Sequence, residues 1–125
     1  MQAVLDYAVN LFEEAKKESV SKIDINYRSE ASAIIFKKKN GDYIERQLDP
    51  SFCIRLMAAI YNLMGECADS PCFVVDRKMR AIIKNCLPKD VSVIRVFSKP
   101  IEKRFGRGCR MSLYISYKYW KRLVS

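Results

Sequence analysis

The spacing of apolar residues changes period within the first thirty positions, and this change limits what the chain can fold into. Over residues 3–18 the apolar side chains recur every three or four positions, from Val4 to Ala15, which predicts an amphipathic helix. Over residues 23–27 apolar and polar residues alternate instead, which is typical of a half-buried strand. A helix followed directly by sheet indicates a chain that mixes both elements.

Turn residues then divide the next segment into a hairpin. Residues 31–38 form a second apolar stretch, and Tyr43–Leu48 returns as its partner strand. The intervening Asn40-Gly41 predicts a type I′ turn, in which both central residues have positive φ.

A second helix begins at Asp49-Pro50. The Asp49 side chain is suited to cap the free amide groups, and Pro50 occupies the first turn, where its missing N–H costs nothing. Gly65 is expected to end this helix in the C′ position. The helix places five apolar residues on one face: Cys53, Leu56, Met57, Ile60 and Met64.

The remaining sequence predicts short strands separated by loops. We expect strands at 73–75, 79–83, 91–97 and 111–117, with an exposed, mobile hairpin loop between the last two. The chain of 125 residues, without a linker or repeat, predicts a single domain over residues 1–125. The expected fold class is α+β, a mixed and mainly antiparallel sheet with two helices packed on one face.

The charge is strongly basic and unevenly placed. The formal net charge is +9. Residues 1–50 carry eight Lys/Arg and nine Asp/Glu, whereas residues 51–125 carry fifteen and five. Such an asymmetry indicates an acidic partner, which is nucleic acid, an acidic protein face or anionic lipid.

The sequence lacks the common motifs of catalytic and metal-binding sites. The chain has no histidine, no GxxxxGK[ST] loop and no CxxC pair. Its five cysteines are odd in number, and we expect them to be free thiols. No apolar run is long enough to span a bilayer. We therefore expect a cytoplasmic protein that is not an enzyme and has no cofactor or metal site.

The segment from Ser98 to Arg110 has the composition of a phosphate-contacting finger. Phe105 lies among its basic residues as a candidate stacking ring. Nucleic acid and an acidic protein surface remain equal alternatives, and a hairpin tip that only keeps the domain soluble is the plainer interpretation. The partner- or anion-binding candidates are Lys99, Lys103, Arg104, Arg107 and Arg110.

Several local motifs resemble a known family. Ser21-Lys22-Ile23-Asp24-Ile25-Asn26 resembles the "SDINI" strand near the start of secretion traffic ATPases, the hexameric motors of type II and type IV secretion and of conjugation. A glycine hairpin turn, the Leu48-Asp49-Pro50 helix start and a last strand over 110–115 follow in the same order. The chain is similar to the N-terminal, PAS-like domain of these motors, in its Dot/Icm-like and conjugation-type members, over roughly residues 3–117.

The resemblance implies a domain that does not hydrolyse ATP, packs against a neighbouring subunit and supplies arginines toward the nucleotide. The corresponding inter-subunit candidates here are Arg77, Arg80 and Arg95, together with Arg110. Two positions depart from the pattern: Tyr114 stands where the family usually has arginine, and Lys22 stands where it usually has serine. The chain also ends about where the motor domain begins in that family, so either an excised domain or a stand-alone protein is expected.

Two hypotheses of function follow from the sequence. The first is a non-catalytic protein-interaction domain of a type IV secretion or conjugative transfer system, which docks to ATPase subunits or to other cytoplasmic components. The second is a small basic nucleic-acid-binding protein that uses the 99–110 loop. The identity of the partner and the assembly into a homo-oligomer are left open.

Overall fold

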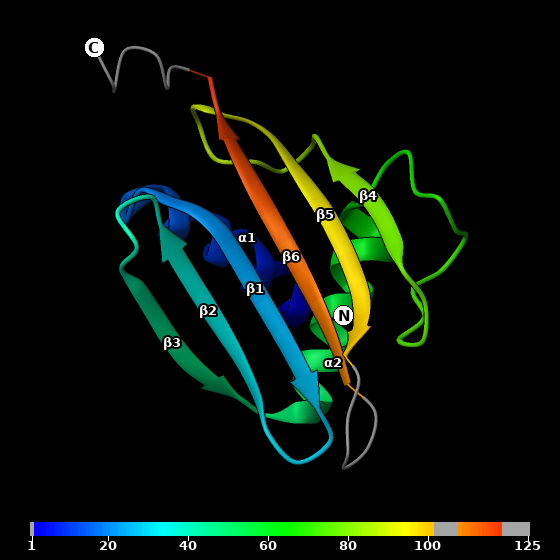
Figure 1. Ribbon diagram of the computed structural model, residues 1–125. Helices are drawn as coiled ribbons and strands as arrows, with labels where there is room; N and C mark the ends of the chain where they lie inside the picture. Colours follow the sequence, from blue (N-terminus) through cyan, green and yellow to red (C-terminus); the bar gives the residue numbers. More distant parts are fainter. Residues whose placement is uncertain (1, 102–107, 119–125) are drawn as a thin grey trace.

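The computed structural model describes residues 2–101 and 108–118, which form one antiparallel sheet with helices along one of its faces (Figure 1). The helical elements are α1 (Gln2–Lys17), α2 (Pro50–Ala59) and the π-helical turn η1 (Ile60–Met64). The strands are β1 (Val20–Arg28), β2 (Ser32–Lys38), β3 (Tyr43–Leu48), β4 (Met79–Ile83), β5 (Val91–Ile101) and β6 (Gly108–Tyr117). They lie in the order β3-β2-β1-β6-β5-β4, which confirms the predicted α+β class.

The core lies between the helices and one face of the sheet. The apolar stripe of α1 is buried as its spacing predicts, with Leu11 and Phe12 almost inaccessible to solvent. These side chains share one buried cluster with Ile23 and Ile25 of β1, one of the two central strands, and both isoleucines are fully buried. Burial of this stripe is the main force that holds α1 on the sheet.

The start of α2 is confirmed in detail. The Asp49 carboxylate accepts a hydrogen bond of 3.1 Å from the backbone N–H of Phe52, and Pro50 occupies the first turn. The Phe52 ring packs edge-on against Tyr7 of α1, with ring centroids 5.0 Å apart. The cap therefore fixes both the beginning of α2 and its contact with α1.

The helix ends at Gly65, but not for the reason that the sequence suggests. Gly65 has φ −71° and ψ 139°, so its backbone is extended rather than left-handed. A Cβ atom built at this position would lie 2.5 Å from the carbonyl oxygen of Tyr61 and 2.9 Å from Cβ of Ala81. Close packing between η1 and β4 therefore requires the glycine.

Gly65→Ala is accordingly expected to lower the free energy of unfolding by about 1–3 kcal/mol, the usual range for overpacking a tight site. The backbone oxygen of Tyr61 cannot rotate away as a side chain would, so η1 must shift. Urea denaturation of the variant and the parent measures the difference. An unchanged midpoint would contradict the close contact.

Three details of the predicted strands and turns are wrong. Residues 73–75 form no strand, since this stretch belongs to the loop that leads from η1 to β4. At Asn40-Gly41 only Gly41 has positive φ, 96°, and the N–H of Gly41 donates to the Lys38 carbonyl oxygen. The turn is therefore a three-residue loop with glycine in the left-handed position, and not type I′.

The third correction concerns the loop predicted between residues 98 and 110. β5 continues to Ile101 and β6 begins at Gly108, so both ends of this segment are paired strand. Lys99 lies directly opposite Arg110 in the ladder. The two residues are thereby held on the sheet rather than on a mobile finger.

Candidate functional site

The face of the sheet that the helices do not cover carries an unusual set of side chains. Along β5, Ile94 and Val96 are buried under the helices while Arg95 and Phe97 point to the opposite, open face. Strand alternation produces this division, because successive side chains leave a strand on opposite sides. The same alternation brings Tyr114 of β6 to the open face.

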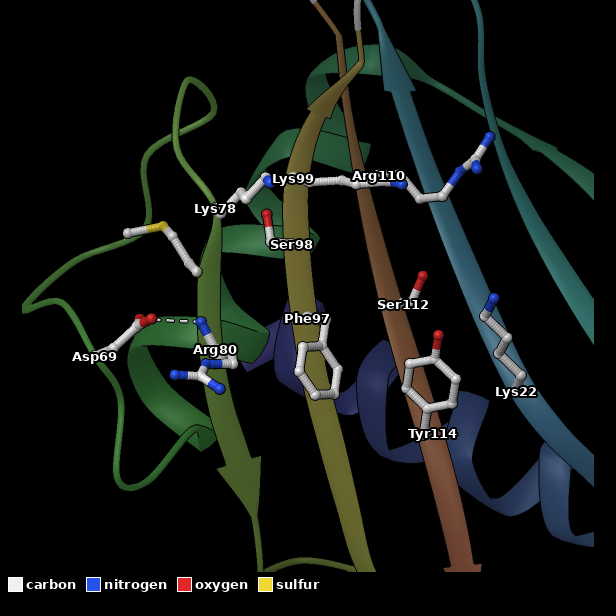
Figure 2. Close-up of a pocket in the computed structure, with 11 residues that line it drawn as sticks. Lys22, Asp69, Lys78, Arg80, Phe97, Ser98, Lys99, Arg110, Ser112 and Tyr114 are labelled. Atoms are coloured by element: carbon white, nitrogen blue, oxygen red, sulfur yellow. Dashed lines mark hydrogen bonds between the residues drawn. The ribbon is translucent and has the colours of Figure 1, made fainter.

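A shallow hollow of about 600 Å³ lies on this open face, across β4, β5, β6 and β1 (Figure 2). Asp69 is the one carboxylate among its lining residues, and the hollow also contains two aromatic rings, Phe97 and Tyr114. We call the rings and the cations of this hollow the basic aromatic face. Its cations are Lys22, Lys78, Arg80, Lys99 and Arg110.

The two rings are adjacent and open to solvent. Phe97 is 40% exposed and Tyr114 is 36% exposed, and their centroids are 5.6 Å apart with planes 83° to each other. Figure 2 shows them side by side on β5 and β6, with Arg80 beyond Phe97 and Lys22 beyond Tyr114. The Lys22 ammonium lies 5.1 Å from the centre of the Tyr114 ring, within cation–π range.

A buried carboxylate, Asp24, borders the basic aromatic face. It accepts hydrogen bonds from the Lys37 ammonium at 2.8 Å and from the Ser112 hydroxyl at 2.6 Å, and Lys22 lies 3.7 Å away. Burial by itself raises the pKa of this carboxyl, but the bonds from Lys37 and Ser112 outweigh it, so the pKa lies below its ordinary value. Asp24 therefore carries a negative charge that neutralises part of its surroundings.

The other cations are not neutralised in this way. Within the described part of the chain, Arg80, Arg95 and Lys99 make no ion pair. Arg110 donates from Nε to the amide oxygen of Asn26 at 2.8 Å, which orients its guanidinium without cancelling its charge. The open face thus keeps a net positive charge beside its two exposed rings.

The loop before β4 is tied to the rim of the hollow. The Tyr61 hydroxyl, on η1, donates to Oδ1 of Asp69 at 3.0 Å, and Asp69 accepts the backbone N–H of Arg80 at 2.9 Å. The bond to that backbone N–H keeps the pKa of Asp69 below its ordinary value, although the carboxylate is exposed. Asp69 therefore acts as a fixed acceptor that sets the position of Arg80.

The structure places on one face of the sheet residues from two groups of candidates that the sequence assigned to different roles. Lys99 and Arg110, predicted to bind a partner or an anion, share the open face with Arg80 and Arg95, predicted to act between subunits. Arg77 lies apart from them, exposed in the loop before β4. The other three candidates in the basic segment lie outside the described residues: Lys103, Arg104 and Arg107.

Sequence reasoning did not bring Lys22, Phe97 and Tyr114 together as one site. A signal for the two rings was present, since Arg95 and Phe97 stand two positions apart in the strand predicted over 91–97, and Lys99 follows Phe97 at the same spacing. Residues at this spacing share a face of a strand, and Tyr114 has the same relation to Ser112. For Lys22 the sequence held no such signal. Its strand, β1, lies beside β6 in the folded sheet but far from it along the chain.

The thiols and acidic groups form no further site in the described residues. Cys53 and Cys109 are buried, and burial raises the pKa of the Cys53 thiol to about 11. Cys67, Cys72 and Cys86 are exposed and unpaired. Within residues 2–101 and 108–118, no group of three His, Cys, Asp or Glu side chains is placed to hold a metal ion, and no helix is long and apolar enough to cross a membrane.

Comparison with known proteins does not assign the chain. No protein-family model matches it, and no similar curated protein was found.

Proposed function

We propose that this protein binds single-stranded nucleic acid across the basic aromatic face of its sheet. The observation that carries the proposal is the exposed pair of Phe97 and Tyr114, set among cations of four neighbouring strands. Aromatic rings on a sheet stack the bases of a single strand, while neighbouring Lys and Arg side chains neutralise its phosphates.

The rings favour nucleic acid over an acidic protein surface. A carboxylate-rich partner is recognised chiefly through cations, whereas every nucleobase also presents a flat apolar face on which the two exposed rings can stack. The rings also favour single strands over duplexes, because the faces of paired bases are covered by their neighbours in the stack. Phosphates fit the outer positions, where Arg80 and Lys22 flank the two rings (Figure 2).

The proposal is tested by fluorescence anisotropy with labelled oligonucleotides of about 12 nucleotides, a length within the usual site size of single-strand binders. Single-stranded DNA and RNA are compared with the duplex of the same sequence and with polyglutamate, which has charge but no bases. We expect the single strands to bind most tightly. Equal binding of polyglutamate would reduce the interaction to charge alone and reject base stacking.

The salt dependence of this binding is expected to show which cations contact phosphates. Arg80→Gln and Lys99→Gln should each lower the slope of log affinity against log salt by about 0.7–1, because each removes one phosphate contact. Titrations at several salt concentrations measure this slope. Arg55→Gln is the matched control, since Arg55 is an exposed cation on α2, in the helical layer. An equal effect of Arg55→Gln would place the nucleic acid elsewhere.

A protein-docking role in a type IV secretion or conjugation system is the second candidate. The "SDINI"-like segment that suggests it forms β1, whose Lys22, Asp24 and Asn26 all contact residues of the neighbouring strands on the open face. This proposal predicts that a traffic ATPase co-purifies with the protein and is encoded beside it. In that case Arg80→Gln and Arg95→Gln should weaken the complex, while oligonucleotides should not bind.

The free cysteines support a cytoplasmic location for either role. The described residues contain five thiols and no disulfide. Exposed thiols such as Cys67 and Cys72 persist in a reducing compartment.

A further inference from the structure

The two edges of the sheet differ in how far their outward backbone groups are hydrogen-bonded. The outer edge of β4 is covered, because Glu66 and Ile82 exchange two backbone hydrogen bonds of 2.6 and 2.9 Å and Asp69 donates to the Arg80 carbonyl. The outer edge of β3 receives no backbone hydrogen bond from any described residue. Over residues 2–101 and 108–118, the sheet therefore has one open edge, along Tyr43–Leu48.

The register with β2 identifies which backbone groups of β3 are unpaired. Lys38 donates to the Asp42 carbonyl at 2.9 Å, and hydrogen-bonded positions alternate along an antiparallel ladder. Ile44 and Arg46, which lie opposite Phe36 and Ile34, are therefore the positions bonded to β2. It follows that the N–H and C=O groups of the other three positions point outward: Tyr43, Glu45 and Gln47.

β3 carries two charges of opposite sign, Glu45 and Arg46, and lacks the other features that keep an edge from pairing with another strand. Native edges are commonly blunted by lysine, proline or a β-bulge. β3 contains none of these: its sequence is Tyr-Ile-Glu-Arg-Gln-Leu, and its register with β2 is continuous. It also exposes two large apolar side chains, Tyr43 at 66% and Ile44 at 38%.

We propose that β3 pairs antiparallel with β3 of a second copy of this chain, with the two Ile44 residues opposite each other. Charge favours this register over the two that are centred on the charged residues of β3. Centring the pair on Glu45 or on Arg46 opposes like charges, which is unfavourable across strands. Centring it on Ile44 places Asp42 opposite Arg46 of the second copy, and apolar side chains meet at the centre.

The geometry of such a pair has a consequence for binding. Antiparallel pairing of identical edges is isologous, with its two-fold axis perpendicular to the sheet, so both open faces lie on the same side of one continuous sheet. If the proposed nucleic-acid binding holds, the dimer presents two basic aromatic faces to one strand. The pairing itself does not depend on that function.

The register is tested by disulfide trapping without nucleic acid, in a background where Cys67, Cys72 and Cys86 are changed to serine. Residues directly opposite at a non-hydrogen-bonded position have Cα atoms about 4.5 Å apart, close enough for a disulfide. Ile44→Cys is therefore expected to form a covalent dimer under mild oxidation. Gln47→Cys, on the same strand but not opposite itself, is expected to stay monomeric. Faster trapping by Gln47→Cys would overturn the register.

Sedimentation tests the pairing itself. The Glu45 N–H points away from β2, so Glu45→Pro removes no backbone hydrogen bond within one copy but removes one across the proposed interface. The exposed side-chain bond from Gln47 to the Glu45 carboxylate, 3.0 Å long, is lost in Glu45→Ala as well. The parent and Glu45→Ala are expected to dimerise with rising concentration, whereas Glu45→Pro stays monomeric with an unchanged circular dichroism spectrum. A parent that remains monomeric at its highest soluble concentration would overturn the proposal.

Discussion

Replacing Phe97 and Tyr114 together by alanine is expected to weaken the binding of single-stranded oligonucleotides by about 30-fold or more. Each stacked base contributes about 1–3 kcal/mol, and every 1.4 kcal/mol is about tenfold in affinity. Both rings are more than a third exposed, so their loss removes little of the core. The affinity is measured by anisotropy at a single fixed salt concentration, because charge is unchanged.

Two further variants distinguish the loss of base stacking from a general effect of removing an apolar side chain. Tyr114→Phe keeps the ring and should bind nearly as the parent does. Leu63→Ala removes an exposed apolar side chain of η1, 54% accessible, from the helical layer and should have no effect. If the double alanine variant binds as tightly as the parent, the rings do not contact bases and the proposed function fails.

Asp24→Ala is expected to have opposite effects on stability and on binding. The variant leaves the Ser112 hydroxyl and the Lys37 ammonium without their partner, at a cost of about 2–3 kcal/mol in unfolding free energy. Lys37 is partly exposed and can be hydrated, so the loss stays below that of a fully buried ion pair. Nucleic-acid affinity should rise, because a negative charge beside the basic aromatic face disappears.

The pH dependence of stability provides a second test of the contribution that the ionised Asp24 carboxylate makes to the fold. Its pKa in the folded protein lies below the ordinary value of 3.8. Its ionised form therefore stabilises the fold above the pKa of the unfolded chain, and this contribution is lost as the pH falls through the folded-state pKa. Asp24→Asn, which cannot titrate, should lose less stability than the parent below about pH 4.

Urea denaturation between about pH 3 and pH 7 compares the two proteins. The other carboxyls with lowered pKa values, Glu14, Asp49 and Asp69, are present in both and cancel in the difference. Parallel stability curves for the parent and Asp24→Asn would show that the Asp24 carboxylate is not an ion-pair partner in the folded state. Weaker oligonucleotide binding by Asp24→Ala would place the nucleic acid away from Asp24.

Local patterns predicted most of the elements because the information for them is local. The apolar stripe of α1 and the cap at Asp49 depend on residues within one or two helical turns, and both are confirmed. Gly65 was located as a helix end, but its cause, contact with Tyr61 and Ala81, lies in the packing of η1 on β4. The strand ends at Ile101 and Gly108 were missed, because the ladder between β5 and β6 continues through residues whose composition suggests a loop.

By itself the sequence determined the α+β class, the excess of basic charge in the second half and the lack of a P-loop or histidine chemistry. Which cations act together was decided only by the tertiary structure. Lys22 and Tyr114 are ninety-two positions apart, yet they lie directly opposite each other because β6 pairs with β1. Strand order is set by long-range pairing and core burial, which no local pattern encodes, and so the basic aromatic face appears only when the sheet is assembled.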